Sequence, residues 1–222
     1  FKTAIEINPN IVQFWISYAG ALINEKQFEE AELCYKKIIE FKPDNIIFHY
    51  NLGKLLNQLG KLDEAEESYN RAIELNPNFV EAYNNLGSIF HTLKKFNDAE
   101  KNYKKAIELK PDFVYAHNNM GNLQQDLAQL NAAEISYKKA LEFEPNFIEA
   151  HENLAILIKQ KILLLKIEDE SKIKESDITI NLNSDTRLNP SPFIAERNVE
   201  KDLLTNLYKI SSNYTLKTND AR

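Results

Sequence analysis

The sequence predicts an all-α protein built from stacked antiparallel helix pairs, and three features with a period of 34 residues predict it. Prolines recur at this period, each followed by Asn or Asp: Pro9, Pro43, Pro77, Pro111 and Pro145. Small residues form two columns, with Ala19, Gly53, Gly87, Gly121 and Ala155 in one, and Ala31, Ala65, Ala99 and Ala133 in the other. Aromatic residues form a third column of Phe1, Tyr35, Tyr69, Tyr103 and Tyr137. Such fixed columns are typical of helical repeats that stack on one another.

Each Pro-Asx pair is interpreted as the end of one helix and the start of the next. Proline lacks a backbone N–H and clashes with the preceding turn, so it cannot continue a helix. An Asn or Asp side chain can accept hydrogen bonds from the free amides at a helix start. We therefore expect the residue after each proline to cap the following helix: Asn10, Asp44, Asn78, Asp112 and Asn146.

The columns divide the chain into repeats. Residues 1–11 are expected to be the end of an earlier repeat, and residues 148–175 a partial fifth repeat that becomes a capping helix. In that fifth repeat the second-helix Ala and aromatic columns fall on Ile167 and Ser171, so the pattern ends there. Between them we expect four full repeats, at 12–45, 46–79, 80–113 and 114–147, which completes a repeat array over 1–175.

The remaining residues have a different composition. Residues 176–197 are rich in Asn, Ser, Asp and Pro and are predicted to be a linker. Residues 198–222 are predicted to be a short helix and an irregular tail that lead into a further domain. Within 198–210, one helix face carries four apolar residues, Val199, Leu203, Leu207 and Ile210.

Repeats two and three show the same residue types at matching positions. Repeat two carries His49, Leu52, Gly53, Leu56, Ala65, Tyr69, Ala72 and Pro77, and repeat three carries Tyr83, Leu86, Gly87, Phe90, Ala99, Tyr103, Ala106 and Pro111. This pattern resembles the tetratricopeptide repeat. The resemblance implies a right-handed superhelical solenoid of helix pairs. It also implies a non-catalytic scaffold that binds a peptide or partner protein in a concave groove.

The face of each first helix opposite its packed side is polar. When the Gly/Ala column is counted as position 8, a rotation of 100° per residue places positions 2, 6, 9 and 13 on this opposite side. Position 6 is asparagine in four repeats, and position 5 adds Asn84 and Asn118 on the flank. In the architecture that the sequence resembles, this face lines the groove. The candidate binding residues are Asn51, Asn84, Asn85, Ser88, His91, Tyr115, Asn118, Asn119, Asn122 and Asn153.

Asparagine suits a surface that binds an extended peptide. Neighbouring helices lie roughly 8 to 10 Å apart and an extended strand rises about 3.3 Å per residue, so successive asparagines could meet every third residue. The side-chain amide offers both a donor and an acceptor to a peptide group. The column is similar to the asparagine ladder in the repeat arm of O-linked N-acetylglucosamine transferases. The alternative is that asparagine here is a solvated residue common throughout the family.

Another binding mode of the family is not supported by the sequence. The carboxylate clamp that some members use for acidic C-termini requires Lys, Asn, Asn, Lys and Arg at set positions of three consecutive repeats. Starting from repeat one, this chain supplies Ile16, Gly20, Asn51, Glu81 and Asn85. Only the middle Asn matches, so binding of acidic C-termini by that clamp is not expected.

Composition narrows the classes of partner and the compartment. The chain has 27 Lys and Arg against 33 Asp and Glu, a formal net charge of −6, which argues against a nucleic-acid partner. The longest apolar cluster, at 158–167, is interrupted by lysines, so no membrane contact is expected. Cys34 is the single cysteine, which excludes an intramolecular disulfide and favours a cytoplasmic, reducing compartment.

The sequence shows no catalytic or metal-binding motif. His49, His117 and His151 all occupy position 4 of separate repeats and are interpreted as packing residues, whereas a metal site needs converging ligands. We therefore expect no cofactor and no enzymatic activity in residues 1–222. The alternative is a substrate-recruiting arm of an enzyme whose catalytic domain lies beyond Arg222, such as a 2-oxoglutarate oxygenase, a glycosyltransferase or a sulfotransferase.

Overall fold

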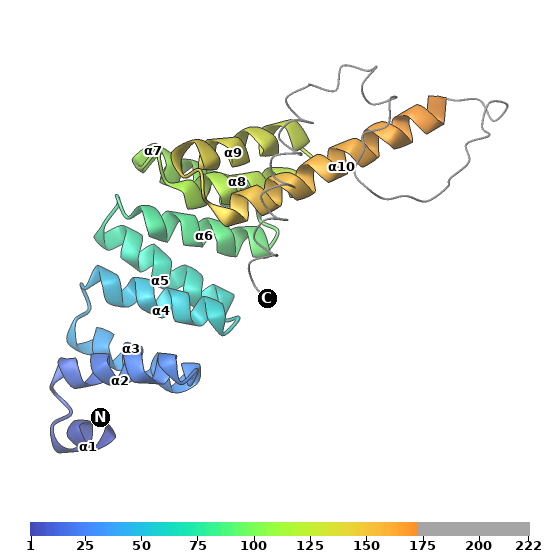
Figure 1. Ribbon diagram of the computed structural model, residues 1–222. Helices are drawn as coiled ribbons and strands as arrows, with labels where there is room; N and C mark the ends of the chain where they lie inside the picture. The colour runs from blue at the N-terminus through green and yellow to red at the C-terminus, as the bar shows by residue number, and fades with distance from the viewer. Residues whose placement is uncertain (173–222) are drawn as a thin grey trace.

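The computed structural model describes residues 1–172, and side chains are described for residues 1–165. Within this range the protein is all-α and has no strand, which confirms the predicted fold class. The helices stack in chain order from α1 at the N-terminal end to α10 at the other (Figure 1). Their bounds are α1 Lys2–Ile7, α2 Val12–Asn24, α3 Phe28–Phe41, α4 Ile46–Gln58, α5 Leu62–Leu75, α6 Val80–Thr92, α7 Phe96–Leu109, α8 Val114–Asp126, α9 Leu130–Phe143 and α10 Ile148–Lys172.

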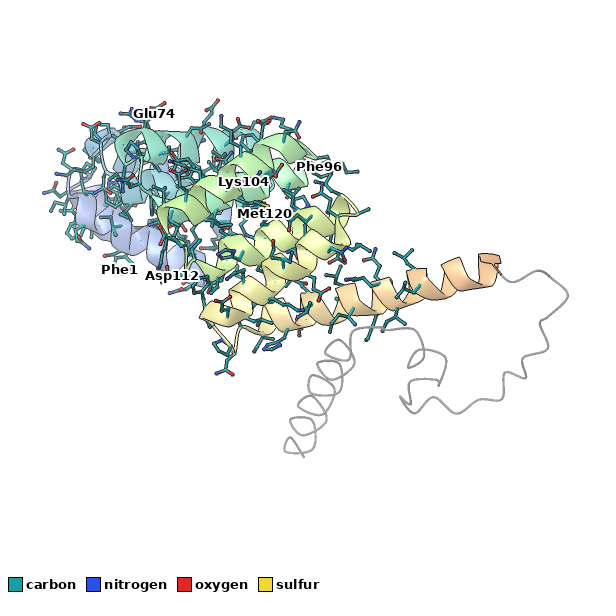
Figure 2. All side chains as sticks on the ribbon, turned by 90° about the horizontal axis from the view of Figure 1, so that it is seen from above. Phe1, Glu74, Phe96, Lys104, Asp112 and Met120 are labelled. Atoms are coloured by element: carbon teal, nitrogen blue, oxygen red, sulfur yellow. The ribbon has the colours of Figure 1, made fainter. Side chains whose placement is uncertain are left out.

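Four helix pairs follow one another at the period of the sequence: α2 with α3, α4 with α5, α6 with α7, and α8 with α9. The columns of small and aromatic residues form the interior of each pair. Ala99 and Tyr103 of α7 are buried. Met120 of α8, which is labelled in Figure 2, packs in the same cluster. Gly87 of α6 lies against the ring of Tyr103, so the small residue allows the two helices to approach.

The stack curves with the first helix of each pair on the inner side. From α4 onward, consecutive first helices contact one another directly: α4 contacts α6, α6 contacts α8, and α8 contacts α10. Among the described helices, by contrast, the second helices α5, α7 and α9 make no contact with one another. Because the first helices are closer together, their outward surface forms the concave face of the solenoid.

The helix starts differ from the expectation that the residue after each proline is the cap. The N-cap residues are one position later: Ile11 for α2, Asn45 for α4, Phe79 for α6 and Phe113 for α8. Asn45 accepts hydrogen bonds from the amides of Ile47 (3.1 Å) and Phe48 (3.3 Å), whereas the other three caps make no side-chain bond. Pro and Asx both lie in the turn, so the Asx side chain precedes the capping position.

The turn within each repeat has a left-handed residue. Gly60 adopts φ 73°, and the equivalent residues Lys26, Lys94 and Ala128 adopt φ 57° to 58°. In the last of these turns the amide of Gln129 donates to the carbonyl of Gln124 (2.8 Å), and that of Ala128 to Gln125 (2.9 Å). This is the pair of bonds that ends a helix in a Schellman motif, in which glycine is the usual left-handed residue.

We expect Ala128→Gly to raise the free energy of unfolding by roughly 0.5–1 kcal/mol, as measured by urea denaturation. A left-handed residue with a Cβ is strained by about 1–2 kcal/mol, and the greater chain entropy of unfolded glycine offsets part of that gain. The control is Gly60→Ala in the equivalent turn, which should destabilise by a similar amount. A change of the same sign for both substitutions would contradict this reading of the turns.

The C-terminal end differs from the repeats before it. α10 is one continuous helix of 25 residues, and the second helix of a fifth repeat is absent from the described residues. The predicted linker at 176–197 and the predicted helix at 198–210 lie outside the described range. No helix within that range has both the length and the apolar composition needed to cross a membrane.

Candidate functional site

The candidate site is the concave face of α4, α6, α8 and α10, and hydrogen bonds between consecutive repeats organise its polar residues. Asn119 Nδ2 donates to Asn84 Oδ1 (2.9 Å), and Asn153 Nδ2 donates to Asn118 Oδ1 (3.0 Å). One repeat earlier, Asn85 Nδ2 donates to the hydroxyl of Tyr50 (3.2 Å). In each bond the amide at position 6 contacts position 5 of the preceding repeat, 35 residues earlier. The asparagines therefore join adjacent first helices.

A second row of bonds with the same spacing lies nearer the C-terminal ends of these helices. His91 Nε2 donates to Asp126 Oδ2 (2.7 Å), and Gln125 Nε2 donates to Gln160 Oε1 (3.2 Å). Each bond joins position 12 of one repeat to position 13 of the next. The polar side chains of the concave face are therefore held by their neighbours in two rows.

The buried tyrosines of the second helices reach this face with their hydroxyl groups. The Tyr137 hydroxyl is the donor in both of its contacts, with Asn122 Oδ1 at 2.7 Å and Gln125 Oε1 at 3.0 Å. Asn85 Nδ2 also donates to the Tyr69 hydroxyl (3.4 Å). Burial raises the pKa of Tyr69, Tyr103 and Tyr137 well above the usual value for tyrosine. These hydroxyls therefore stay protonated at neutral pH and are available as hydrogen-bond donors.

Sequence reasoning did not identify this role of the tyrosines. Their column was interpreted as packing alone, because a 34-residue repeat shows which residues are equivalent and not which polar atoms meet. A signal was present in the spacing. Position 5 of one repeat and position 6 of the next are always 35 residues apart, and in repeats two to five both positions carry residues that can form hydrogen bonds.

The candidate residues differ in how much of the side chain is accessible. Asn84 and Asn118, which the sequence places on the flank of the groove, are buried with 7% of their surface exposed. They are covered because the neighbouring first helix packs over them. Tyr115 is the most exposed, at 52%, and its ring contacts Phe113 and Phe147 at centroid distances of 5.5 Å and 5.2 Å. The half-buried candidates are Asn51, Asn85, Ser88, His91, Asn119, Asn122 and Asn153.

Comparison with known proteins agrees with the helix pairs and their period. Family models for the tetratricopeptide repeat match residues 12–45, 34–67, 80–113 and 102–135, and a further TPR repeat model matches 53–94. Residues 12–135 of this chain are tetratricopeptide repeats. No curated protein sequence matches the chain.

Solved structures share the fold. The crystal structure of MamA protein is 22% identical, covers 77% of this chain and 97% of its own length, and has a TM-score of 0.60. A tetratricopeptide repeat protein from Parabacteroides merdae is 20% identical over 78% of this chain and 71% of its own, with a TM-score of 0.66. The first TPR of Spaghetti (RPAP3), bound to the HSP90 peptide SRMEEVD, is 27% identical over 53% of this chain and 93% of its own, with a TM-score of 0.50.

Three of the four histidines have a structural role. Nε2 of His49, His117 and His151 lies 2.6 to 2.8 Å from the carbonyl oxygen of the proline six residues earlier, to which it donates. Trp15 Nε1 makes the same contact with Pro9 (2.7 Å). In α2, α4, α8 and α10, position 4 therefore ties the first helix to the turn before it. Among the described side chains, no three His, Cys, Asp or Glu residues are grouped so that they could hold a metal ion.

Cys34 is packed in the first repeat rather than exposed for chemistry. It lies in a cluster with Ala19, Leu22 and Ile38, and its side chain is almost fully buried. Burial, reinforced by the charge of Glu30, raises the pKa of the thiol. Cys34 is therefore protonated at neutral pH and behaves as a small apolar side chain.

Proposed function

We propose that this chain is a protein interaction scaffold whose concave face binds an extended peptide segment of a partner protein. The observation that carries the proposal is the row of asparagines joined between repeats. Asn119 and Asn153 each use one N–H in these bonds, and a primary amide has a second N–H and a carbonyl oxygen. These free groups support the proposal of an asparagine ladder that the sequence suggested.

The bonds between repeats favour binding because they fix the amides before a ligand arrives. An exposed, mobile side chain must lose rotamer freedom when it binds, which costs roughly 0.5–1.5 kcal/mol for each immobilised residue. Asn119 and Asn153 are half-buried and already bonded to a neighbour, so most of this cost is met in folding. Because Asn84 and Asn118 are buried, we propose that they hold the row and that position 6 contacts the ligand.

A second component of the site would contact side chains of the ligand. Tyr115 is exposed at the start of α8 and is supported by two phenylalanine rings, so it offers a fixed apolar surface. His91 and Asp126 add a polar pair on the same face. Backbone contacts through the asparagines would provide general affinity, and these residues would provide selectivity.

The bound structure of the Spaghetti repeat supports a peptide as the class of ligand, because that domain holds the HSP90 peptide SRMEEVD. The chemistry of recognition would differ here. An acidic C-terminus is held by basic side chains, whereas the clamp positions of repeats one to three carry Ile16, Glu81 and Asn85. We therefore propose that the ligand is an internal, extended segment, bound chiefly through its peptide groups.

The proposal predicts a loss of affinity that does not depend on the peptide. Several unrelated peptides would be selected from a random displayed library, and their dissociation constants measured by titration calorimetry. Each lost hydrogen bond should weaken binding by roughly 0.5–1.5 kcal/mol, so Asn119→Ala with Asn153→Ala should raise Kd about tenfold for every peptide. Tyr115→Ala should instead raise Kd by amounts that differ between peptides.

The matched control is Asn70→Ala with Asn97→Ala, which alters two exposed asparagines of the second helices and should leave Kd unchanged. The variant with Asn119→Ala and Asn153→Ala should also lose stability, by about 1 kcal/mol for each bond. The titrations must therefore be done well below its melting temperature. If the Kd values of all selected peptides were unchanged, the asparagines would serve only to hold the helices together, and the proposal would be refuted.

A further inference from the structure

α10 takes the place of a helix pair at the C-terminal end of the stack. The first helices of repeats two to four have 13 residues and are each followed by a second helix of 14 residues. α10 instead continues for 25 residues and projects well beyond α8 and α9 (Figures 1 and 2). Within residues 1–172, the surface that a second helix covers in the earlier repeats is therefore left without that cover.

The exposure of equivalent residues shows which face is uncovered. Val114 at position 1 of α8 is 7% exposed, whereas Ile148 at position 1 of α10 is 57% exposed. At position 8, Gly121 is buried and Ala155 is half-buried. Ile162 follows Ala155 by another seven residues, which places it at the adjoining edge of this face, where it is half-buried because it also packs against the cluster that contains Ala133 and Tyr137 of α9. We name Ile148, Ala155 and Ile162 the terminal stripe.

The residues that follow directly cannot cover the terminal stripe in the manner of a second helix. α10 remains helical through Lys172, so its own chain leads away from the stack instead of turning back. The positions that hold the buried Ala and Tyr in earlier second helices are occupied by Ile167 and Ser171. Any covering segment must come from later in the chain or from another molecule.

We propose that residues 198–210 of the same chain pack against the terminal stripe. In a helix this segment places Val199, Leu203, Leu207 and Ile210 on one face, with Lys201 and Thr205 on the opposite side. Val199 and Ile210 are about 17 Å apart along such a helix, and Ile148 and Ile162 are about 21 Å apart along α10. The apolar face of the segment is thus long enough to cover most of the terminal stripe.

The intervening chain is long enough to permit this contact. Residues 173–197 can span up to roughly 80 Å when extended, whereas α10 is about 37 Å long. The segment can therefore reach any part of the terminal stripe. Because a tethered segment acts at an effective concentration near the millimolar range, it outcompetes a second copy of the chain at ordinary protein concentrations.

Disulfide trapping in the full chain tests the contact. We expect Ala155→Cys with Leu207→Cys to form a disulfide within one chain under mild oxidation, at least about tenfold faster than Ala155→Cys with Thr205→Cys. Thr205 lies on the opposite side of the predicted helix and serves as the control. The native Cys34 is buried, which keeps it from competing. Equal rates for the two pairs, or a disulfide between two chains, would overturn the proposal.

Hydrogen exchange provides an independent measurement without cysteines. Leu203→Asp with Leu207→Asp should release the segment and increase amide exchange over residues 155–165 by about tenfold or more. Glu200→Lys with Thr205→Asp changes only polar positions of the segment and should leave exchange unchanged. Identical exchange of residues 155–165 in both variants would show that residues 198–210 do not cover α10.

Discussion

Tyr103→Ala should lower the free energy of unfolding by about 3–5 kcal/mol, the cost typical of removing a buried aromatic ring. Tyr103 is 1% exposed and packs with Ala99, Met120 and Leu123 between two helix pairs. Its ring also lies against Gly87, whose missing side chain leaves room for it. Removing the ring would leave a cavity that the backbone of three helices must border. Urea denaturation, followed by circular dichroism, measures the loss.

Two further substitutions serve as controls. One measures the contribution of the Tyr103 hydroxyl to stability, and the other measures the effect of removing an exposed tyrosine ring. Tyr103→Phe removes only the hydroxyl, which is hydrogen-bonded to Ser88, and should cost about 0.5–1.5 kcal/mol. Tyr115→Ala removes a ring that is 52% exposed and should cost at most about 1 kcal/mol. Similar losses for Tyr103→Ala and Tyr115→Ala would mean that the aromatic column is not the interior of the repeats.

Gly121→Ala should lower the free energy of unfolding by about 1–3 kcal/mol, although alanine is the better helix former. A Cβ at Gly121 would lie 2.5 Å from Cε1 and 2.6 Å from Cδ1 of Tyr137. The ring cannot move aside easily, because Tyr137 is fully buried and its hydroxyl is bonded to Asn122 and Gln125. The added methyl group must therefore push α8 and α9 apart.

Gly20→Ala in α2 is the matched control, since a Cβ there meets no atom within 4 Å. With no clash, helix propensity alone should act, and it favours alanine by roughly 1 kcal/mol in a helix interior. The two substitutions are chemically identical and are expected to have opposite signs. Destabilisation by both would mean that the close approach to Tyr137 is not the cause of the loss at Gly121.

Much of the fold could be predicted because its determinants are repeated within the chain. One proline or alanine is weak evidence, but Ala65, Ala99 and Ala133 share a register with Gly53, Gly87 and Gly121. Each column contains the same kind of residue in several repeats, because the same steric requirement applies in each. Without that requirement, random substitution would have made the equivalent residues differ. The helix starts were less predictable. They depend on the turn that Pro and Asx occupy together, which moves the cap to Asn45 and Phe79.

The candidate site was only partly predictable, because a helical wheel shows which residues share a face of one helix and nothing about the neighbouring helices. It places Asn84 beside Asn85 on an outer face and cannot show that the next first helix covers Asn84. Nor can it show that Asn119 bonds to Asn84, a contact between residues 35 positions apart. Polar residues that look solvated in one repeat thus become half-buried in the stack.

By itself the sequence determined the helix pairs, their period of 34 residues and the residues between them, because packing within a repeat is short in range and recurs in every repeat. The tertiary structure alone decided the contacts between repeats. It showed which asparagines are buried and which polar atoms meet along the concave face. It also showed that the fifth repeat continues as one long helix, in which Ile148 of the terminal stripe is exposed. These features depend on the distance and angle between neighbouring pairs, which no single repeat encodes.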